Sequence, residues 1–135
     1  MEDGYSLLDS TMYAMLVRLG SHKRQIAAGL EELGLRLGQE LYLALLWRED
    51  GLSQSALAGQ AKVSAANVTQ VLHGMERQGL VVRRRDDPDA RIQRIWLTEA
   101  GRALESPVTE IWRAAETAWL SGLTPAQRRA VELLK

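Results

Sequence analysis

The chain has 135 residues, of which 46% are hydrophobic and 25% charged, and it contains no cysteine. This composition is typical of one globular domain with a real core, and it excludes disulfides and thiolate metal sites. The longest apolar run, residues 41–47, is far shorter than the ~20 residues of a membrane-spanning helix. No signal-peptide pattern is present at the N-terminus, so we expect a cytoplasmic protein that has no membrane contact.

The formal net charge is zero, but the charges are unevenly distributed along the chain. Residues 1–51 have a net charge of −3, residues 52–102 a net charge of +3, and residues 103–135 are balanced. Local potential governs the encounter with a polyanion more than the total charge does. The middle third is therefore the candidate for contact with a nucleic acid.

The first third predicts two helices. Apolar residues at three- and four-residue intervals predict an amphipathic helix from Ser6 to about Leu33, and they are Leu7, Leu8, Met12, Met15, Leu16, Leu19, Ile26 and Leu30. After a break between Gly34 and Gly38, residues 38–50 predict a second helix. It is apolar on almost every side, so we expect it to be buried, and Gly51 ends it.

The middle third predicts two short helices and two strands. Ser53 is the expected N-cap of a helix through Ala61 that turns Leu57 and Ala58 inward. Ser64 is the expected N-cap of a helix over residues 65–78, with Gly79 as its stop. The buried stripe of that helix is expected to be Val68, Val71, Leu72 and Met75. Residues 80–85 and 92–97 predict two strands joined by a polar turn that contains Pro88.

The last third predicts a long helix and a short one. Thr98 is expected to cap a helix to about Leu120, with an interrupted periodicity near residues 106–107. Thr124, Pro125 and Gln127 form a capping box, which predicts a final helix to Lys135. The fold class we expect is mainly α with a small β-hairpin wing, that is, a winged helix–turn–helix together with a helical dimerisation region.

Two short helices followed by a hairpin form a unit that lays its second helix in a DNA major groove. The outer face of the helix at 65–78 is predicted to contact DNA through Ser64, Ala65, Ala66, Asn67, Thr69, Gln70 and His73. Asn67 and Gln70 can each form a bidentate pair with adenine, and Thr69 can contact a base edge or a thymine methyl group. The alternative is an ordinary solvated helix face.

The segment from Arg83 to Arg94 concentrates charge of both signs. Arg91 lies at the predicted hairpin tip, beside strands that carry Arg83, Arg84, Arg85 and Arg94, and an extended arginine suits the narrow minor groove. Asp89 is close enough to pair with Arg91 and to orient its guanidinium, while Pro88 stiffens the tip. The alternative is an exposed salt-bridge cluster that contributes little energy.

Residues 79–101, GLVVRRRDDPDARIQRIWLTEAG, resemble the multiple-antibiotic-resistance regulator (MarR) family. The family signature is Gly-Leu-Val, basic residues, Asp-x-Arg in the wing and a final Leu-Thr-x-x-Gly. Residues 79–81, 89–91 and 97–101 match it in type and spacing, and residues 52–80 are similar to the helix–turn–helix of the family. Two positions depart from the family's usual arginines, Ala90 in the wing and Gln70 in the recognition helix, and both changes remove positive charge.

The resemblance implies a dimeric repressor or activator, with a repressor released by a small ligand favoured, that binds a pseudo-palindromic operator in double-stranded DNA. Residues 1–35 and 102–135 are then expected to be dimerisation helices, and residues 36–101 the DNA-binding region. Asp89 and Arg91 are implied as wing residues, and residues 64–73 as readers of the major groove. The basic charge of the strands adds Arg84 and Arg85 as expected DNA contacts. The long apolar stripes of the terminal helices agree with a homodimer, although an intramolecular bundle is the alternative.

Family regulators respond to small, often aromatic or phenolic, effectors bound where the dimerisation helices meet the DNA-binding lobe. By that analogy a pocket is expected near Arg18, His22, Tyr42, Trp47 and Trp112, each of which could equally be a packing or surface residue. We expect no cofactor, and no metal, because His22 and His73 lack ligand spacing.

We also expect no enzymatic activity, because no phosphate-binding loop, zinc-protease motif or nucleophile elbow occurs in the sequence. The competing hypothesis is a winged helix that binds protein rather than DNA. Salt dependence of duplex binding distinguishes the two.

Overall fold

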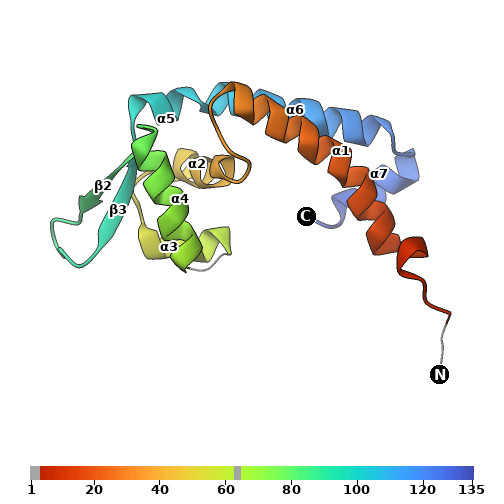
Figure 1. Ribbon diagram of the computed structural model, residues 1–135, viewed down its shortest axis with the longest axis horizontal. Helices are drawn as coiled ribbons and strands as arrows, with labels where there is room; N and C mark the ends of the chain where they lie inside the picture. The colour runs from red at the N-terminus through yellow and green to blue at the C-terminus, as the bar shows by residue number, and fades with distance from the viewer. Residues whose placement is uncertain (1–3, 63–64) are drawn as a thin grey trace.

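The computed structural model describes residues 4–62 and 65–135. A winged lobe of short helices and a small sheet occupies one end, and two long helices run side by side away from it (Figure 1). None of the helices in the described residues has the length and apolar character needed to cross a membrane. In chain order the elements are η1 (Leu7–Asp9), α1 (Thr11–Glu32), α2 (Gln39–Arg48), β1 (Leu52–Ser53), α3 (Gln54–Ala61), α4 (Ala65–Arg77), β2 (Val81–Arg85), β3 (Gln93–Leu97), α5 (Glu99–Ala103), α6 (Glu105–Ser121) and α7 (Pro125–Glu132).

Side-chain caps set where the helices begin. The Ser53 hydroxyl accepts a hydrogen bond from the Ala56 amide at 3.1 Å, and the Thr98 hydroxyl accepts one from Gly101 at 3.1 Å, which confirms both predicted N-caps. The capping box at Thr124 is also confirmed, with both of its hydrogen bonds present. The helix that it starts ends at Glu132, however, and not at Lys135 as predicted.

The predicted start of the first helix at Ser6 is wrong. The Ser10 hydroxyl accepts from the Tyr13 amide at 3.1 Å, so Ser10 is the N-cap and α1 begins at Thr11. Residues 7–9 form a separate 3₁₀ turn. The apolar spacing continues through this turn, and for that reason periodicity alone did not reveal the boundary.

The single long helix predicted from Thr98 is also wrong, because α5 ends at Ala103 and α6 begins at Glu105. Proline has no amide hydrogen, so Pro107 cannot donate to the Ala103 carbonyl as a continuous helix requires. In α6 the same proline lies in the first turn, where the backbone amides need no intrahelical partner. The proline therefore interrupts the helix a few residues before its own position.

The sheet has three antiparallel strands in the order β1-β3-β2. The predicted hairpin is confirmed as β2 and β3, in which Val81 is opposite Leu97 and Arg85 is opposite Gln93. The two-residue strand β1, which pairs Leu52 with Ile95, was not predicted. Two residues are too few to show an alternating pattern.

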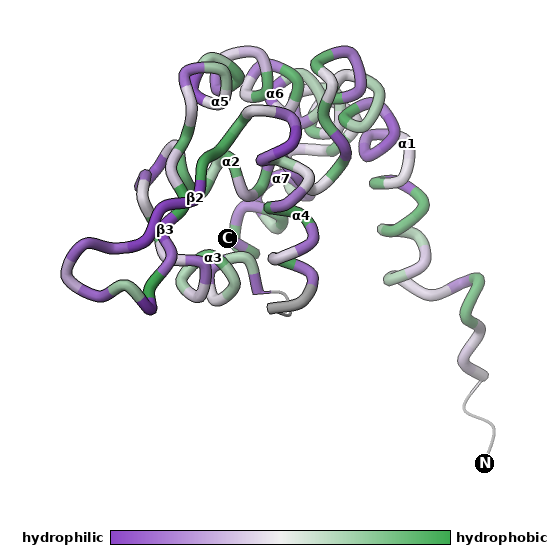
Figure 2. Tube along the Cα trace, turned by 60° about the vertical axis from the view of Figure 1, so that its left-hand side comes forward, coloured by the Kyte–Doolittle hydropathy of each residue, from purple (hydrophilic) through white to green (hydrophobic). Residues whose placement is uncertain are grey.

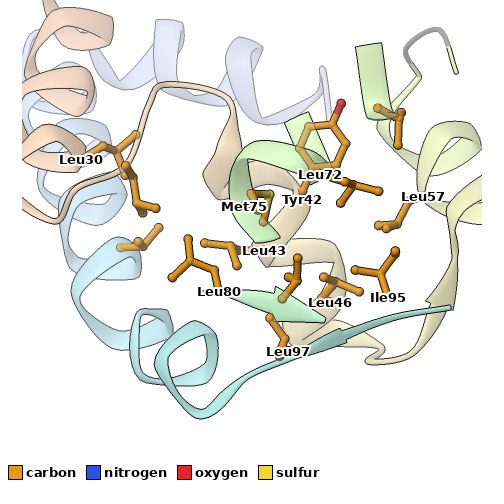
Figure 3. Packing of buried hydrophobic residues seen from close by; sticks show 14 of the residues in the cluster. Leu30, Tyr42, Leu43, Leu46, Leu57, Leu72, Met75, Leu80, Ile95 and Leu97 are labelled. Carbon is orange, nitrogen blue, oxygen red and sulfur yellow. The ribbon is translucent and has the colours of Figure 1, made fainter. Parts of the chain in front are cut away.

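The core of the winged lobe is formed by side chains from its strands and from helices α2, α3 and α4 (Figure 3). The predicted stripe of α4 is confirmed, because Val68, Leu72 and Met75 are fully buried and Val71 is half-buried. The other fully buried side chains of the lobe include Leu43 and Leu46 of α2, Leu57 of α3 and Ile95 of β3. Helix α2 is less buried than predicted, because Leu41 is 52% exposed.

Two glycines allow close packing that a side chain would prevent. A Cβ on Gly101 would overlap the carbonyl oxygen of Leu80, and the Thr98 amide donates to that same oxygen at 3.0 Å. Gly51 has a φ of 74° and lies against the Trp96 ring, where a Cβ would also overlap. The two contacts fix the base of the hairpin against α5 and against the end of α2.

Candidate nucleic-acid interface

Helix α4 presents a polar face away from the core. Asn67, Gln70 and His73 are exposed, and Thr69 is half-buried. The four are placed this way because the opposite stripe of the helix is anchored in the core. Ala65 and Ala66 form the start of α4. Ser64, the predicted cap, lies outside the described residues.

The hairpin arginines fall into two groups. Arg83 donates from Nε to Glu76 Oε1 at 2.8 Å, and from Nη1 to Gln54 Oε1 at 2.8 Å and Gln93 Oε1 at 3.0 Å. Arg94 donates from Nε to Asp86 Oδ1 at 3.1 Å and from Nη1 to the Gly51 carbonyl at 3.0 Å.

These two guanidiniums are bonded within the protein. Arg84, Arg85 and Arg91 are exposed. The charged residues of this segment therefore have two roles: some form hydrogen bonds within the protein, and the others form an exposed basic surface.

The predicted pair at the hairpin tip is present. Arg91 donates from Nε to Asp89 Oδ1 at 3.0 Å and from Nη2 to Oδ2 at 3.1 Å, and its backbone amide also donates to Oδ1 at 3.0 Å. These hydrogen bonds lower the pKa of Asp89 and raise the pKa of Arg91. The Arg91 side chain is nevertheless 91% exposed, so it is oriented by its partner and still accessible.

Asp50 is an anchoring residue that the sequence did not single out. Its Oδ1 accepts from the backbone amides of Gly51 at 3.0 Å and Leu97 at 2.9 Å, and its Oδ2 accepts from Arg102 at 3.1 Å. It thereby joins the end of α2 to β3 and α5. Its position just before a glycine turn is the only sequence signal for this role.

A cavity of about 760 Å³ lies where α1, α2 and α6 meet. His22, Trp47 and Trp112 of the expected pocket line it, together with Trp119 and Glu40, which were not predicted. Arg18 is exposed on α1 and is not part of the lining. The indole of Trp47 donates to the Gly101 carbonyl at 2.9 Å, which ties the cavity wall to the winged lobe.

Glu40 is a buried acid in the wall of this cavity. It is 2% exposed, and its carboxylate accepts from the Gly38 amide at 2.9 and 3.2 Å. Burial raises the pKa of Glu40, although the backbone hydrogen bonds act in the opposite direction. Its place in an apolar helix gave no sign of a buried charge, because glutamate is common on exposed helix faces.

Tyr42 lines a second cavity, of about 740 Å³, between α2 and α4. Burial raises the pKa of its hydroxyl. Asn67 and Gln70 lie in the wall of the same cavity. The expected effector residues are therefore divided between two cavities.

The arrangement defines a class: a winged helix–turn–helix with an exposed polar helix and an arginine-tipped hairpin. Within residues 4–62 and 65–135, no three His, Cys, Asp or Glu side chains gather as metal ligands would. The sequence profile of the MarR family matches residues 35–92.

Curated relatives extend the match over most of the chain. The HTH-type transcriptional repressor Rv2887 of Mycobacterium tuberculosis is 34% identical over 122 residues, which cover 90% of this chain and 88% of the relative. The chain belongs to the MarR family and is a DNA-binding transcriptional regulator of the winged helix–turn–helix type.

Solved structures agree with this assignment. MepR of S. aureus in complex with DNA is 25% identical and superposes with a TM-score of 0.82, covering 92% of each chain. A MarR transcriptional regulator from Methanosarcina mazei Go1 is 28% identical, with a TM-score of 0.78 over 90% of this chain and 87% of the other.

Proposed function

We propose that the protein is a homodimeric repressor that binds a pseudo-palindromic operator and is released by a small ligand. The observation that carries the DNA-binding mode is the bidentate Asp89–Arg91 pair, in which the Arg91 side chain is held by the carboxylate and is 91% exposed. A pre-oriented arginine loses less conformational entropy when it enters the minor groove. Asp89 is then a positioning residue, although it adds a negative charge near DNA.

Helix α4 is proposed to read the major groove. Asn67 and Gln70 are exposed on it and carry the amides that pair with adenine, and His73 extends the same face by one turn. Thr69 contributes a hydroxyl and a methyl group at the edge of this face. We propose that residues 64–66 approach the backbone of the duplex closely, and that Arg84 and Arg85 contact phosphates beside the wing.

The terminal helices are proposed to form the dimer. Residues 1–35 and 102–135 would constitute the dimerisation part, and residues 36–101 the DNA-binding part. Figure 2 shows apolar segments along α1 and a hydrophilic wing. The exposed large apolar side chains of the two terminal segments include Leu7, Leu8, Met12, Leu16, Val17, Leu133 and Leu134. Burying such a surface stabilises association. Two copies would place two α4 helices in successive major grooves.

The cavity at the junction of α1, α2 and α6 is proposed as the effector site. Trp47, Trp112 and Trp119 offer aromatic surface to a small aromatic or phenolic molecule. Because the cavity is lined by both the long helices and α2 of the winged lobe, a ligand that fits one relative orientation of the two better would favour that orientation. No catalytic role is proposed for any residue.

The proposal is tested with a duplex selected from a random DNA pool by the purified protein. Fluorescence anisotropy should then show a log K that falls steeply with log salt, by about 0.9 for each phosphate neutralised. Binding that is insensitive to salt, or no preference over a scrambled duplex of equal length, would overturn it. The first outcome would favour a winged helix that binds protein.

A further inference from the structure

A chain of hydrogen bonds connects the wing to the recognition helix through the first helix of the helix–turn–helix. Arg83 of β2 donates from Nη1 to Gln54 Oε1 at 2.8 Å, and Gln54 Nε2 donates to Thr69 Oγ1 at 2.8 Å. We call these three residues the polar relay. Its last member lies on α4, within the set proposed to contact bases.

The direction of each hydrogen bond in the polar relay is fixed by chemistry. A guanidinium has donors only, so the atom of Gln54 that faces Arg83 must be the carbonyl oxygen. The amide nitrogen of Gln54 must then face Thr69 and donate to its hydroxyl oxygen. Arg83 thus determines the orientation of an amide that could otherwise flip, and through it the position of the Thr69 hydroxyl.

Arg83 also holds α4 at a second point. Its Nε donates to Glu76 Oε1 at 2.8 Å, and the Arg83 side chain is only 20% exposed. Thr69 and Glu76 are seven residues apart, which is about two turns along the same side of the helix. One side chain of the wing strand therefore constrains both the reading part and the C-terminal part of α4.

We propose that Arg83 and Gln54 are positioning residues that set the base preference of the recognition helix, through the polar relay, without touching a base themselves. The inference rests on the proposed major-groove role of α4 and adds to it a source of specificity outside that helix. The wing and the recognition helix are then one rigid reading unit. A change in the relay should alter which duplex is preferred more than it alters stability.

The decisive variant is Gln54→Glu. A carboxylate still accepts from Arg83, but it has no hydrogen to donate to Thr69, so the hydrogen bond from residue 54 to the Thr69 hydroxyl is lost. Gln93 gives a matched control, because Gln93 Oε1 accepts from the same Arg83 Nη1 at 3.0 Å and that bond does not lead to α4. Gln93→Glu therefore adds the same charge beside the same arginine and leaves the Gln54–Thr69 bond in place.

The readout is the affinity for the selected duplex relative to each of its single-base-pair variants, measured by anisotropy at fixed salt, with melting temperatures in parallel. We expect Gln54→Glu to reduce the preference about tenfold at base pairs facing α4. Gln93→Glu should weaken all duplexes by a common factor and keep the preference. In a Thr69→Val background, Gln54→Glu should have no further effect on the preference.

If Gln54→Glu behaves like Gln93→Glu, or if its effect persists in the Thr69→Val background, the relay does not set base preference. Arg83→Lys provides an independent test, because it keeps the charge but lacks the planar fork whose separate nitrogens reach Glu76 and Gln54. It should reduce the preference as Gln54→Glu does. An unchanged preference in folded Arg83→Lys would overturn the proposal. A wild-type protein that prefers no duplex would instead contradict the proposed function.

Discussion

The winged lobe and the long helices beside it are built from similar proportions of apolar residues, but they use them differently. In the lobe, Leu57, Leu72 and Ile95 are fully buried by neighbours from the same chain. In the 22 residues of α1, only Ile26 and Leu30 are buried. The lobe completes its core within one chain, whereas most of the apolar surface of α1 has no cover within that chain.

The polar side chains of the two regions also differ, in whether their hydrogen bonds join separate parts of the chain. In the lobe, Asp50, Arg83 and Arg94 each form hydrogen bonds with at least two different segments of the chain. On α6, the ion pair of Glu110 with Arg113 joins neighbouring turns of one helix. A domain that holds a DNA-reading surface in a fixed position needs contacts that join several elements. A long helix that is proposed to pack against a second chain needs fewer of them.

Truncation of a core leucine should have the largest effect. Leu72→Ala removes a fully buried side chain of α4, and we expect a loss of about 3 kcal/mol in the free energy of unfolding. Leu16→Ala is the matched control, because Leu16 is 64% exposed on α1. Urea denaturation at low protein concentration should separate the two, and equal losses would contradict the contrast between the regions.

Charge on the apolar face of α1 should disrupt the dimer and leave the fold of the chain intact. We expect Leu16→Asp to raise the dissociation constant of the dimer at least tenfold. The new carboxylate would be buried without a partner when two chains associate, and such burial is costly. Sedimentation equilibrium measures this change, and circular dichroism checks the fold. An unaltered association constant would indicate that the dimer uses a different surface.

If Asp89 orients Arg91, removal of the Asp89 carboxylate should weaken DNA binding even though it removes a negative charge. Asp89→Ala removes a negative charge from the wing, yet we expect operator affinity to fall about threefold to tenfold, because Arg91 loses its bidentate partner. Conversely, Arg91→Ala should raise the pKa of Asp89 towards its ordinary value of 3.8, which NMR titration can follow. Tighter operator binding by Asp89→Ala would contradict the orienting role.

Glu40 should produce a small pH dependence of stability. Its pKa is raised by burial above the ordinary value of 4.5, so the folded chain binds this proton more tightly than the unfolded chain. Its contribution to stability is then fully present below the unfolded value and is lost as pH rises through the folded value. Urea denaturation at several pH values should show that Glu40→Gln gains stability relative to wild type as pH rises through the folded pKa of Glu40. A difference in stability that does not change with pH would contradict the raised pKa.

Local signals predicted most of the fold. The stripe of α4, the caps at Ser53 and Thr98 and the two hairpin strands each depend on a few neighbouring residues, and all were confirmed. The wrong or missing predictions concern element boundaries and one strand that depend on a specific cap, on a proline or on pairing with a distant segment. Ser10 rather than Ser6 caps α1, Pro107 breaks a helix before its own position, and β1 exists only because it pairs with β3.

The candidate site was predictable in its types of residue but not in how they are used. The sequence indicated that Asp89 and Arg91 could pair, because they are two residues apart in a tight turn. It could not distinguish Arg83, which is hydrogen-bonded to α4, from its exposed neighbour Arg84. The alternation of a strand predicts that neighbouring side chains point to opposite faces, but it does not predict their hydrogen-bond partners. Gln54 had no signal at all, since its two partners are 15 and 29 residues away.

The central claim is that α4 and the arginine-tipped wing read duplex DNA together. The most direct measurement compares wild type with Arg91→Ala on the selected duplex over a series of salt concentrations. We expect the variant to bind at least tenfold more weakly and the slope of log K against log salt to decrease by about 1. Equal affinity and equal slope for the two proteins would contradict the account.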